Sequence, residues 1–335
     1  MAKIKEDQYA FPCAIIRASE KTLLDPAALD RVLESDQIDQ AMNVLAEFGY
    51  GDGKELASPR DFEKVLRAEL DRVYSLVFSI VPDKEEIELF LLPNDYHNAK
   101  VLLKSEFLGI DAAPLLVDTG TVAAEKLSDA VRERNYIFLS AEMKEGLLEA
   151  AEVFSKGRDP QEIDIILDKA CYRDMQKRAE LTGNDFIIGY VKLLTDILNV
   201  NTFIRLREIG KPFEFFRKVF LPGGDIDEKV FTGSYEEGYQ QLADKMAPFG
   251  FRDVFAQGAA AVQAEGKYTL LEKLCDDMKM KYMKDAKYKT FGIEPVCAFL
   301  TAKESEVKNL RMILTGMLAG TSREVTKERL RETYV

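Results

Sequence analysis

Three segments of this chain repeat one arrangement of residues, at a spacing that limits the folds open to it. In each segment an acidic residue precedes an asparagine by three positions, and a glycine follows that asparagine by eleven. The nine positions are Asp95, Asn98 and Gly109, then Asp196, Asn199 and Gly210, then Glu306, Asn309 and Gly320. The asparagines stand 101 residues apart (98 to 199) and 110 residues apart (199 to 309), which is too long for a solenoid repeat and suits a small domain. We therefore expect three tandem homologous domains, at residues 1–112, 113–215 and 216–335.

The pattern inside each repeat is helical. Apolar side chains follow each asparagine by four and five positions, and the glycine suits the residue after a helix, where a left-handed backbone costs glycine little. In the third repeat Pro295 is well placed for a first turn, and no breaker precedes Gly316 and Gly320, which predicts a long helix. Thr321 and Glu324 then form a capping box that predicts a last helix. Alternating β-branched runs are few, so we predict an all-α fold built from three helical bundles.

One repeat also carries a residue set suited to acid–base or nucleophilic chemistry. DYHNAK places Asp95, the single histidine His97 and Lys100 within six positions. The other repeats have leucine and lysine in place of His97, and asparagine and arginine in place of Lys100, so this set is not repeated. We interpret the repeated positions as architectural, each serving a buried polar contact or a helix end. The alternatives are an enzyme built around these three residues, or a pH-sensitive contact at His97.

The charge and hydropathy of the chain exclude several functional classes. The 46 lysines and arginines oppose 58 acidic residues, and the net charge of −12 would repel nucleic-acid phosphates and an anionic membrane leaflet alike. The longest apolar runs, at 73–81 and 87–92, are far shorter than the roughly 18–20 residues of a membrane-spanning helix. The N-terminal MAKIKEDQYAFP has no signal-peptide core. We therefore expect a cytoplasmic protein that binds no nucleic acid and has no direct membrane span.

No motif predicts a metal site, a cofactor or a catalytic residue. The cysteines at 13, 171, 275 and 297 are scattered, and one histidine cannot complete a common zinc set. GYGDGKE (49–55) lacks the first glycine and the Ser or Thr of a phosphate-binding loop, so we interpret it as a polar turn. Most acids alternate with basic residues, as in KESEVKNLR (303–311), which is typical of a solvated helix face.

The chain as a whole resembles the C subunit of the bacterial and archaeal V/A-type ATPases, a family that includes the d subunit of the eukaryotic vacuolar ATPase. The stretches that carry the resemblance are YAFPCAIIRASEKTLLDPAALDRVLE, DYHNAKVLLK, EIDIILDKACYRDM and YKTFGIEPVCAFLTAKESEVKNLRMILTGMLAGTSREVTKERLRETYV. They follow one another in the expected order from about residue 8 to residue 335, and the last fifty residues are the most specific part.

The resemblance implies a fold and a role. It implies a funnel of three similar helical domains with pseudo-threefold symmetry, placed between the rotor shaft and the membrane-embedded proteolipid ring. The partners would be the D- and F-type shaft proteins and the cytoplasmic loops of the ring, and the protein would transmit torque between ATP hydrolysis or synthesis and the movement of H⁺ or Na⁺. Such a component is not a catalyst, and it is held at the inner face of the membrane through the complex. The chief alternative is a general helical-repeat scaffold that binds other cytosolic proteins.

Overall fold

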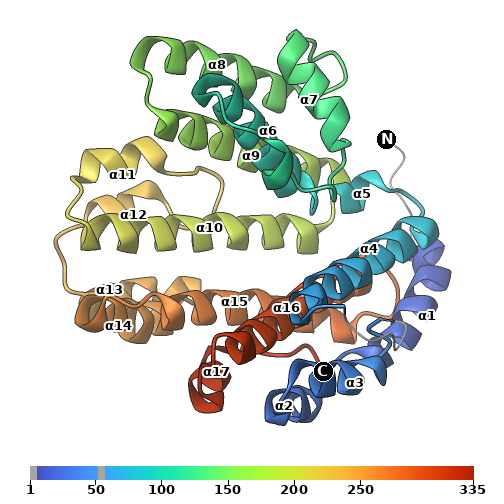
Figure 1. Ribbon diagram of the computed structural model, residues 1–335. Coiled ribbons are helices and arrows are strands. Elements are labelled where there is room, and N and C mark those ends of the chain that lie inside the picture. Colours follow the sequence, from blue (N-terminus) through green and yellow to red (C-terminus); the bar gives the residue numbers. More distant parts are fainter. Residues whose placement is uncertain (1–5, 52–56) are drawn as a thin grey trace. The chain divides into compact units, whose positions relative to one another are not determined.

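The computed structural model describes residues 6–51 and 57–335, and within these ranges every regular element is a helix and none is a strand (Figure 1). The expected all-α class is confirmed. Residues 52–55 of the predicted polar turn lie outside the described part of the chain. The chain divides into two compact units, one made of residues 1–82 together with 236–335, and the other of residues 83–235. This division does not test the three sequence-related segments, which stay a prediction.

The first unit combines both ends of the sequence. Its α-helices are α1 (Ala10–Ser19), α2 (Pro26–Glu34), α3 (Ile38–Ala46), α4 (Phe62–Ile80), α13 (Tyr239–Met246), α14 (Ala260–Glu265), α15 (Thr269–Lys284), α16 (Glu294–Leu318) and α17 (Arg323–Arg329). A π-helical segment, Val254–Ala259, precedes α14.

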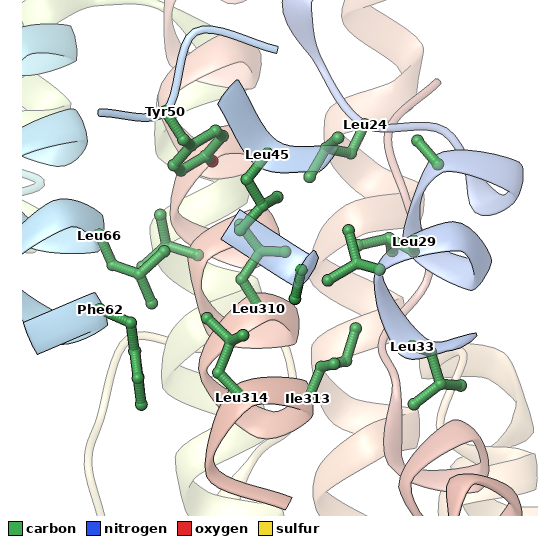
Figure 2. Packing of buried hydrophobic residues seen from close by; sticks show 14 of the residues in the cluster. Leu24, Leu29, Leu33, Leu45, Tyr50, Phe62, Leu66, Leu310, Ile313 and Leu314 are labelled. Atoms are coloured by element: carbon green, nitrogen blue, oxygen red, sulfur yellow. The ribbon is translucent and has the colours of Figure 1, made fainter. Parts of the chain in front are cut away.

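A single hydrophobic cluster joins the N-terminal helices of this unit to the C-terminal helix α16 (Figure 2). Leu29 of α2, Leu45 of α3 and Leu66 of α4 contribute to it from the N-terminal side, and Leu310 and Ile313 contribute from α16. All five side chains are buried, and burying each one stabilises the fold by about 1.5–3 kcal/mol. Segments separated by more than 200 residues therefore fold as one unit.

Helix α16 has the length that the sequence predicts. It runs for 25 residues from Glu294, with Pro295 in its first turn, and ends before Gly320. Gly316 does not end it. A Cβ on Gly316 would lie 2.9 Å from Oγ1 of Thr326, so this glycine allows α17 to approach the helix closely.

The start of α17 differs by one residue from the predicted capping box. Ser322, not Thr321, is the N-cap, and its hydroxyl accepts from the N–H of Val325. Thr321 belongs to the end of the preceding helix instead, because its N–H donates to the carbonyl oxygen of Gly316. A helix does begin at this point with a hydroxyl side chain as its cap, but Thr321 is part of the hydrogen bonding that ends α16, so the cap is the next residue.

The second unit contains α5 (Glu85–Glu88), α6 (Leu92–Leu108), α7 (Ala124–Glu133), α8 (Ala141–Gly157), α9 (Pro160–Thr182), α10 (Asp185–Glu208), α11 (Phe213–Val219) and α12 (Glu228–Thr232). Side-chain caps start the long helices: Asp159 accepts from Gln161 N–H before α9, and Asn184 accepts from two backbone N–H groups before α10. Phe203 of α10 lies at the centre of an aromatic group, with the rings of Phe216 and Phe231 at 5.4 and 5.2 Å. This packing fixes α11 and α12 against α10.

Helix α10 is also the one helix of the described residues that is long and apolar enough to cross a membrane by length and composition. More than half of its most apolar window, 56%, is buried inside the protein. Its apolar side chains, such as Phe203 and Ile204, belong to the core of the second unit, which is the usual situation of a long core helix.

Candidate functional site

The three repeated asparagines make the same contact. Each side-chain amide donates to the carbonyl oxygen of a later residue and accepts from the N–H of that same residue, so that it bridges one backbone position. The pairs are Asn98 with Val117 (2.7 and 2.8 Å), Asn199 with Leu221 (2.8 and 2.9 Å) and Asn309 with Arg331 (3.0 and 2.8 Å). All three asparagines are buried. The contact thus ties α6, α10 and α16 to the segment that follows each of them, and it satisfies backbone groups outside the helices.

The repeated aspartates bind the same segments at a second place, a few residues after the backbone position that the asparagine bridges. Asp95 accepts from the N–H groups of Thr121 (3.1 Å) and Val122 (3.2 Å) and from the Thr121 hydroxyl (2.6 Å). Asp196 accepts from the N–H groups of Asp225 (2.8 Å) and Ile226 (3.2 Å). In both repeats two successive N–H groups just before the next helix bind one buried carboxylate.

Two glycines outside the nine repeated positions make this approach possible. Gly120 and Gly224 directly precede the N–H groups bound by the two aspartates. A Cβ would lie 2.2 Å from Oδ1 of Asp95 at Gly120, and 2.0 Å from Oδ1 of Asp196 at Gly224. No side chain fits there. The only sequence signal was a glycine shortly before the next helix in both repeats, which composition alone does not distinguish from an ordinary turn.

In the third repeat the N-terminal segment supplies the partner. Glu306 accepts from the N–H of Leu24, which lies 282 residues earlier in the sequence and shortly before α2. The same carboxylate accepts from the hydroxyl of Tyr50 and from Nζ of Lys303 (2.6 Å). An acid again binds a backbone N–H just before a helix, but here that helix comes from the other end of the chain.

Around Glu306 lies a buried ionic cluster, which corrects the interpretation of KESEVKNLR as a solvated face. Lys303 is fully buried, with its Nζ 2.6 Å from Glu306 and 3.2 Å from Glu69. Glu69 also accepts two bonds from the Arg72 guanidinium, at 2.7 and 2.8 Å. Lys303 therefore balances two buried carboxylates, and Glu69 is balanced further by Arg72, whose side chain is 56% exposed, which makes burial of Lys303 tolerable. Only part of the stretch is solvated, including Lys308.

The structure does not bring Asp95, His97 and Lys100 together as a reactive set. Asp95 is buried against the turn at 121–122, whereas His97 is exposed, with its Nε2 3.1 Å from the carbonyl oxygen of Leu115. Lys100 pairs with Asp168 at 2.7 Å. Each of the three side chains therefore has its own separate partner.

The electrostatics of the aspartates agree with a structural role. Burial raises the pKa of Asp95 and of Asp196 above the usual range of a carboxyl group, while the bonds from backbone N–H groups oppose this shift. Both oxygens of each carboxylate accept hydrogen bonds from the following segment. A carboxylate held in this way is poorly placed to bind a substrate.

Metal-ligating groups are not gathered anywhere in the described ranges: no cluster of three or more His, Cys, Asp or Glu side chains could hold an ion. The four cysteines are free and buried at separate places in the two units. Burial raises the pKa of Cys171 and of Cys13, which keeps both thiols protonated and unreactive at neutral pH.

The repeated glycines have the backbone conformation that the sequence predicts. The φ angles of Gly109, Gly210 and Gly320 are 68°, 68° and 66°, and each glycine follows the end of a long helix by one or two residues. This region favours glycine because a Cβ there crowds the backbone.

Replacing Gly109 by valine is expected to lower the free energy of unfolding by about 1–2 kcal/mol, the cost of a left-handed conformation in a residue with a Cβ. No atom lies within 4 Å of an added Cβ, so the loss would come from the backbone and not from packing. Urea denaturation followed by circular dichroism measures it. The matched control is Gly109→Asn, which should lose less because asparagine tolerates this conformation. Equal losses in the two variants would contradict the explanation.

Comparison with known proteins gives one consistent family. Residues 12–329 match the family model described as the ATP synthase (C/AC39) subunit. The chain is 24% identical over 320 residues to the C subunit of the V-type sodium ATPase of Enterococcus hirae, covering 96% of this chain and 97% of that protein. It is 25% identical over 330 residues to the C subunit of the A-type ATP synthase of Methanocaldococcus jannaschii, covering 92% of this chain and 83% of that protein. It is 24% identical over 330 residues to the C subunit of the V-type ATP synthase of Thermus thermophilus, covering 96% of this chain and 98% of that protein.

Proposed function

Because the chain belongs to the ATP synthase (C/AC39) subunit family, and so to the V/A-type rotary ATPases, we propose that it is the non-catalytic coupling component of the central stalk. It links the shaft, made of D- and F-type proteins, to the cytoplasmic loops of the proteolipid ring. Through this link, torque passes between ATP hydrolysis or synthesis and the translocation of H⁺ or Na⁺. The protein stays in the cytoplasm, peripherally attached to the inner face of the membrane through the complex.

The observation that carries this proposal is the set of three buried asparagine contacts. A torque transmitter must keep its shape under load, since moving one charge against 100 mV already corresponds to about 2.3 kcal/mol. Each long helix is tied to the following segment by two hydrogen bonds from one buried amide. Ties of this kind oppose sliding of the helices past their connecting segments, because any slip would leave buried polar groups unpaired.

The same contacts support, as part of the proposal, three homologous domains in a pseudo-threefold funnel. One asparagine of the tie lies in each of the segments 1–112, 113–215 and 216–335, and the backbone partners of the first two, Val117 and Leu221, lie near the start of the segment that follows. The third carboxylate, Glu306, binds the N–H of Leu24, so we propose that the first segment closes the third. This contact holds the segment before α2 against α16.

A groove on the first unit is the surface that we assign to the shaft. It has a volume of about 770 Å³ and runs along α16, between α4 and α17. Apolar side chains such as Leu70, Val307 and Met312 line it, and Arg311 and Arg329 are placed at it as well. An apolar channel with polar margins is the kind of site that receives an amphipathic helix of a partner.

Titration calorimetry of the purified chain against the two-protein shaft of the same ATPase tests the proposal. We expect saturable one-to-one binding, because a coupler must hold the shaft without slipping. No detectable heat from two folded samples, at both low and physiological salt, would refute the coupling role and favour a general helical scaffold.

Two matched variants locate the shaft contact within that experiment. Thr315→Trp places a bulky side chain in the groove from an exposed position and should weaken binding by about tenfold or more, that is by at least about 1.4 kcal/mol. Leu318→Trp, at a 45% exposed position near the end of the same helix and outside the groove lining, should leave the affinity unchanged. If both variants bound the shaft with the affinity of the wild type, the shaft would bind outside this groove, and the coupling role itself would not be affected.

A further inference from the structure

We propose that a basic and aromatic patch on the first unit binds the headgroups of an anionic membrane surface. The patch comprises Phe11 on α1 together with Lys281, Tyr288, Lys289 and Phe291, which lie at the end of α15 and in the turn before α16. The partner of this patch is lipid and not another protein of the complex, so its role lies beyond the coupling role. We call these five residues the basic–aromatic patch.

The aromatic members of the patch are unusually open to solvent. Tyr288 is 88% exposed, Phe11 is 65% exposed and Phe291 is 47% exposed. Large apolar side chains gathered on a surface usually mark a contact site. Aromatic rings are also the side chains that prefer the boundary between water and a bilayer, where the headgroups lie.

The turn that carries Tyr288 and Phe291 is fixed to α1. The guanidinium of Arg17 donates to the carbonyl oxygens of Ala286 (2.9 Å), Lys287 (3.3 Å) and Lys289 (2.9 Å). The thiol of Cys13 donates to the carbonyl oxygen of Gly292 at 3.3 Å. Both ends of the turn are therefore held against α1, the helix that carries Phe11.

The charge of the segment 281–289 is opposite to that of the whole chain. Residues 281–289 contain four lysines and one aspartate, a net charge of +3 in a chain of −12. Two of these lysines are engaged: Lys284 pairs with Glu332, and Nζ of Lys287 lies 4.7 Å from the ring of Tyr334. Lys281 and Lys289 are exposed, and neither has an ion-pair partner among the described residues. Their charges are therefore available to an external anion.

A lipid surface suits this composition better than a protein partner does. Lysine is depleted at the core of protein–protein interfaces, whereas lysines beside aromatic rings are typical of segments that bind anionic bilayers. Each lysine close to such a surface contributes about 1 kcal/mol. The acidic remainder of the chain would be repelled by the same surface, so the patch would also orient the protein. The repulsion expected from the net charge is thus reversed locally.

Sedimentation of the full chain with lipid vesicles tests the proposal. We expect binding to vesicles of phosphatidylcholine mixed with phosphatidylglycerol at low salt, little binding to pure phosphatidylcholine, and weaker binding as salt rises. The double variant Lys281→Glu with Lys289→Glu should bind at least about thirtyfold more weakly, because losing two lysines removes about 2 kcal/mol and the two added carboxylates are repelled by the same surface. Tyr288→Ser should also weaken binding, but with the same dependence on salt.

The control carries the same change of charge away from the patch. Lys144→Glu with Lys156→Glu alters two exposed lysines on α8 of the second unit and should keep most of the vesicle binding. Equal binding by the two double variants, or no binding of the wild type to anionic vesicles at low salt, would overturn the proposal. If only assembly of the ATPase were lost in the patch variant, the partner would be an acidic protein and the lipid proposal would be wrong. Shaft titration of the same variants tests the coupling role separately.

Discussion

Replacing Lys303 by methionine is expected to lower the free energy of unfolding by about 3–5 kcal/mol, the usual cost of removing one partner from a buried ionic cluster. Lys303 is fully buried between Glu306 and Glu69. Methionine fills a similar volume, so the loss would come from a carboxylate left without its cation and not from a cavity. Glu69 would retain its bonds from Arg72, whereas Glu306 would have no cation beside it. Denaturant titration of the variant and the wild type gives the difference.

The matched control for this variant lies further along the same helix. Lys308 is 47% exposed at its side chain and pairs with Asp276, so Lys308→Met should cost less than about 1 kcal/mol. A loss that is the same in both variants would show that the charges around Lys303 do not stabilise the core.

The repeated asparagines show how far the sequence could lead. The spacing of Asn98, Asn199 and Asn309 predicted recurring architectural positions, and in the structure each asparagine bridges one backbone position of a later segment. Helical periodicity and fixed spacing are local properties, so they can be read along the chain. The backbone partners could not be predicted. They lie 19 or 22 residues later, in connecting segments of different length that share no residue type at the contact.

The ionic cluster shows where the sequence misled. In KESEVKNLR, Lys303 and Glu306 belong to the core, whereas Lys308 and Arg311 face solvent, and all four appear as ordinary alternating charges. A buried pair and a solvated pair have the same spacing on a helix, so the pattern cannot separate them. The packing of α2, α3 and α4 against α16 determines which of these charged residues are buried. No local feature of the sequence predicts that the two ends of the chain will pack together.

Replacing Gly120 by alanine is expected to cost about 3 kcal/mol or more of unfolding free energy. The added Cβ would lie 2.2 Å from Oδ1 of Asp95, closer than any real contact, so the carboxylate must leave its position. It would then lose the N–H groups of Thr121 and Val122, and each unsatisfied buried group costs about 1–3 kcal/mol. Gly157→Ala is the control, since nothing lies within 4 Å of its Cβ and alanine is preferred in a helix.

A double-mutant cycle separates this cause from a general intolerance of the turn. In a background where Asp95 is alanine, the obstructing carboxylate is absent, so Gly120→Ala should cost less than about 1 kcal/mol. The second repeat provides an independent copy of the test, because a Cβ on Gly224 would lie 2.0 Å from Oδ1 of Asp196. If the cost of Gly120→Ala were unchanged in the Asp95→Ala background, the carboxylate would not be what requires glycine there. If removing the aspartate reduced the cost of the glycine substitution at Gly120 but not at Gly224, the carboxylate would be what requires glycine in one repeat and not in the other. The two repeats would then have the same backbone geometry, but the aspartate contact would stabilise only one of them.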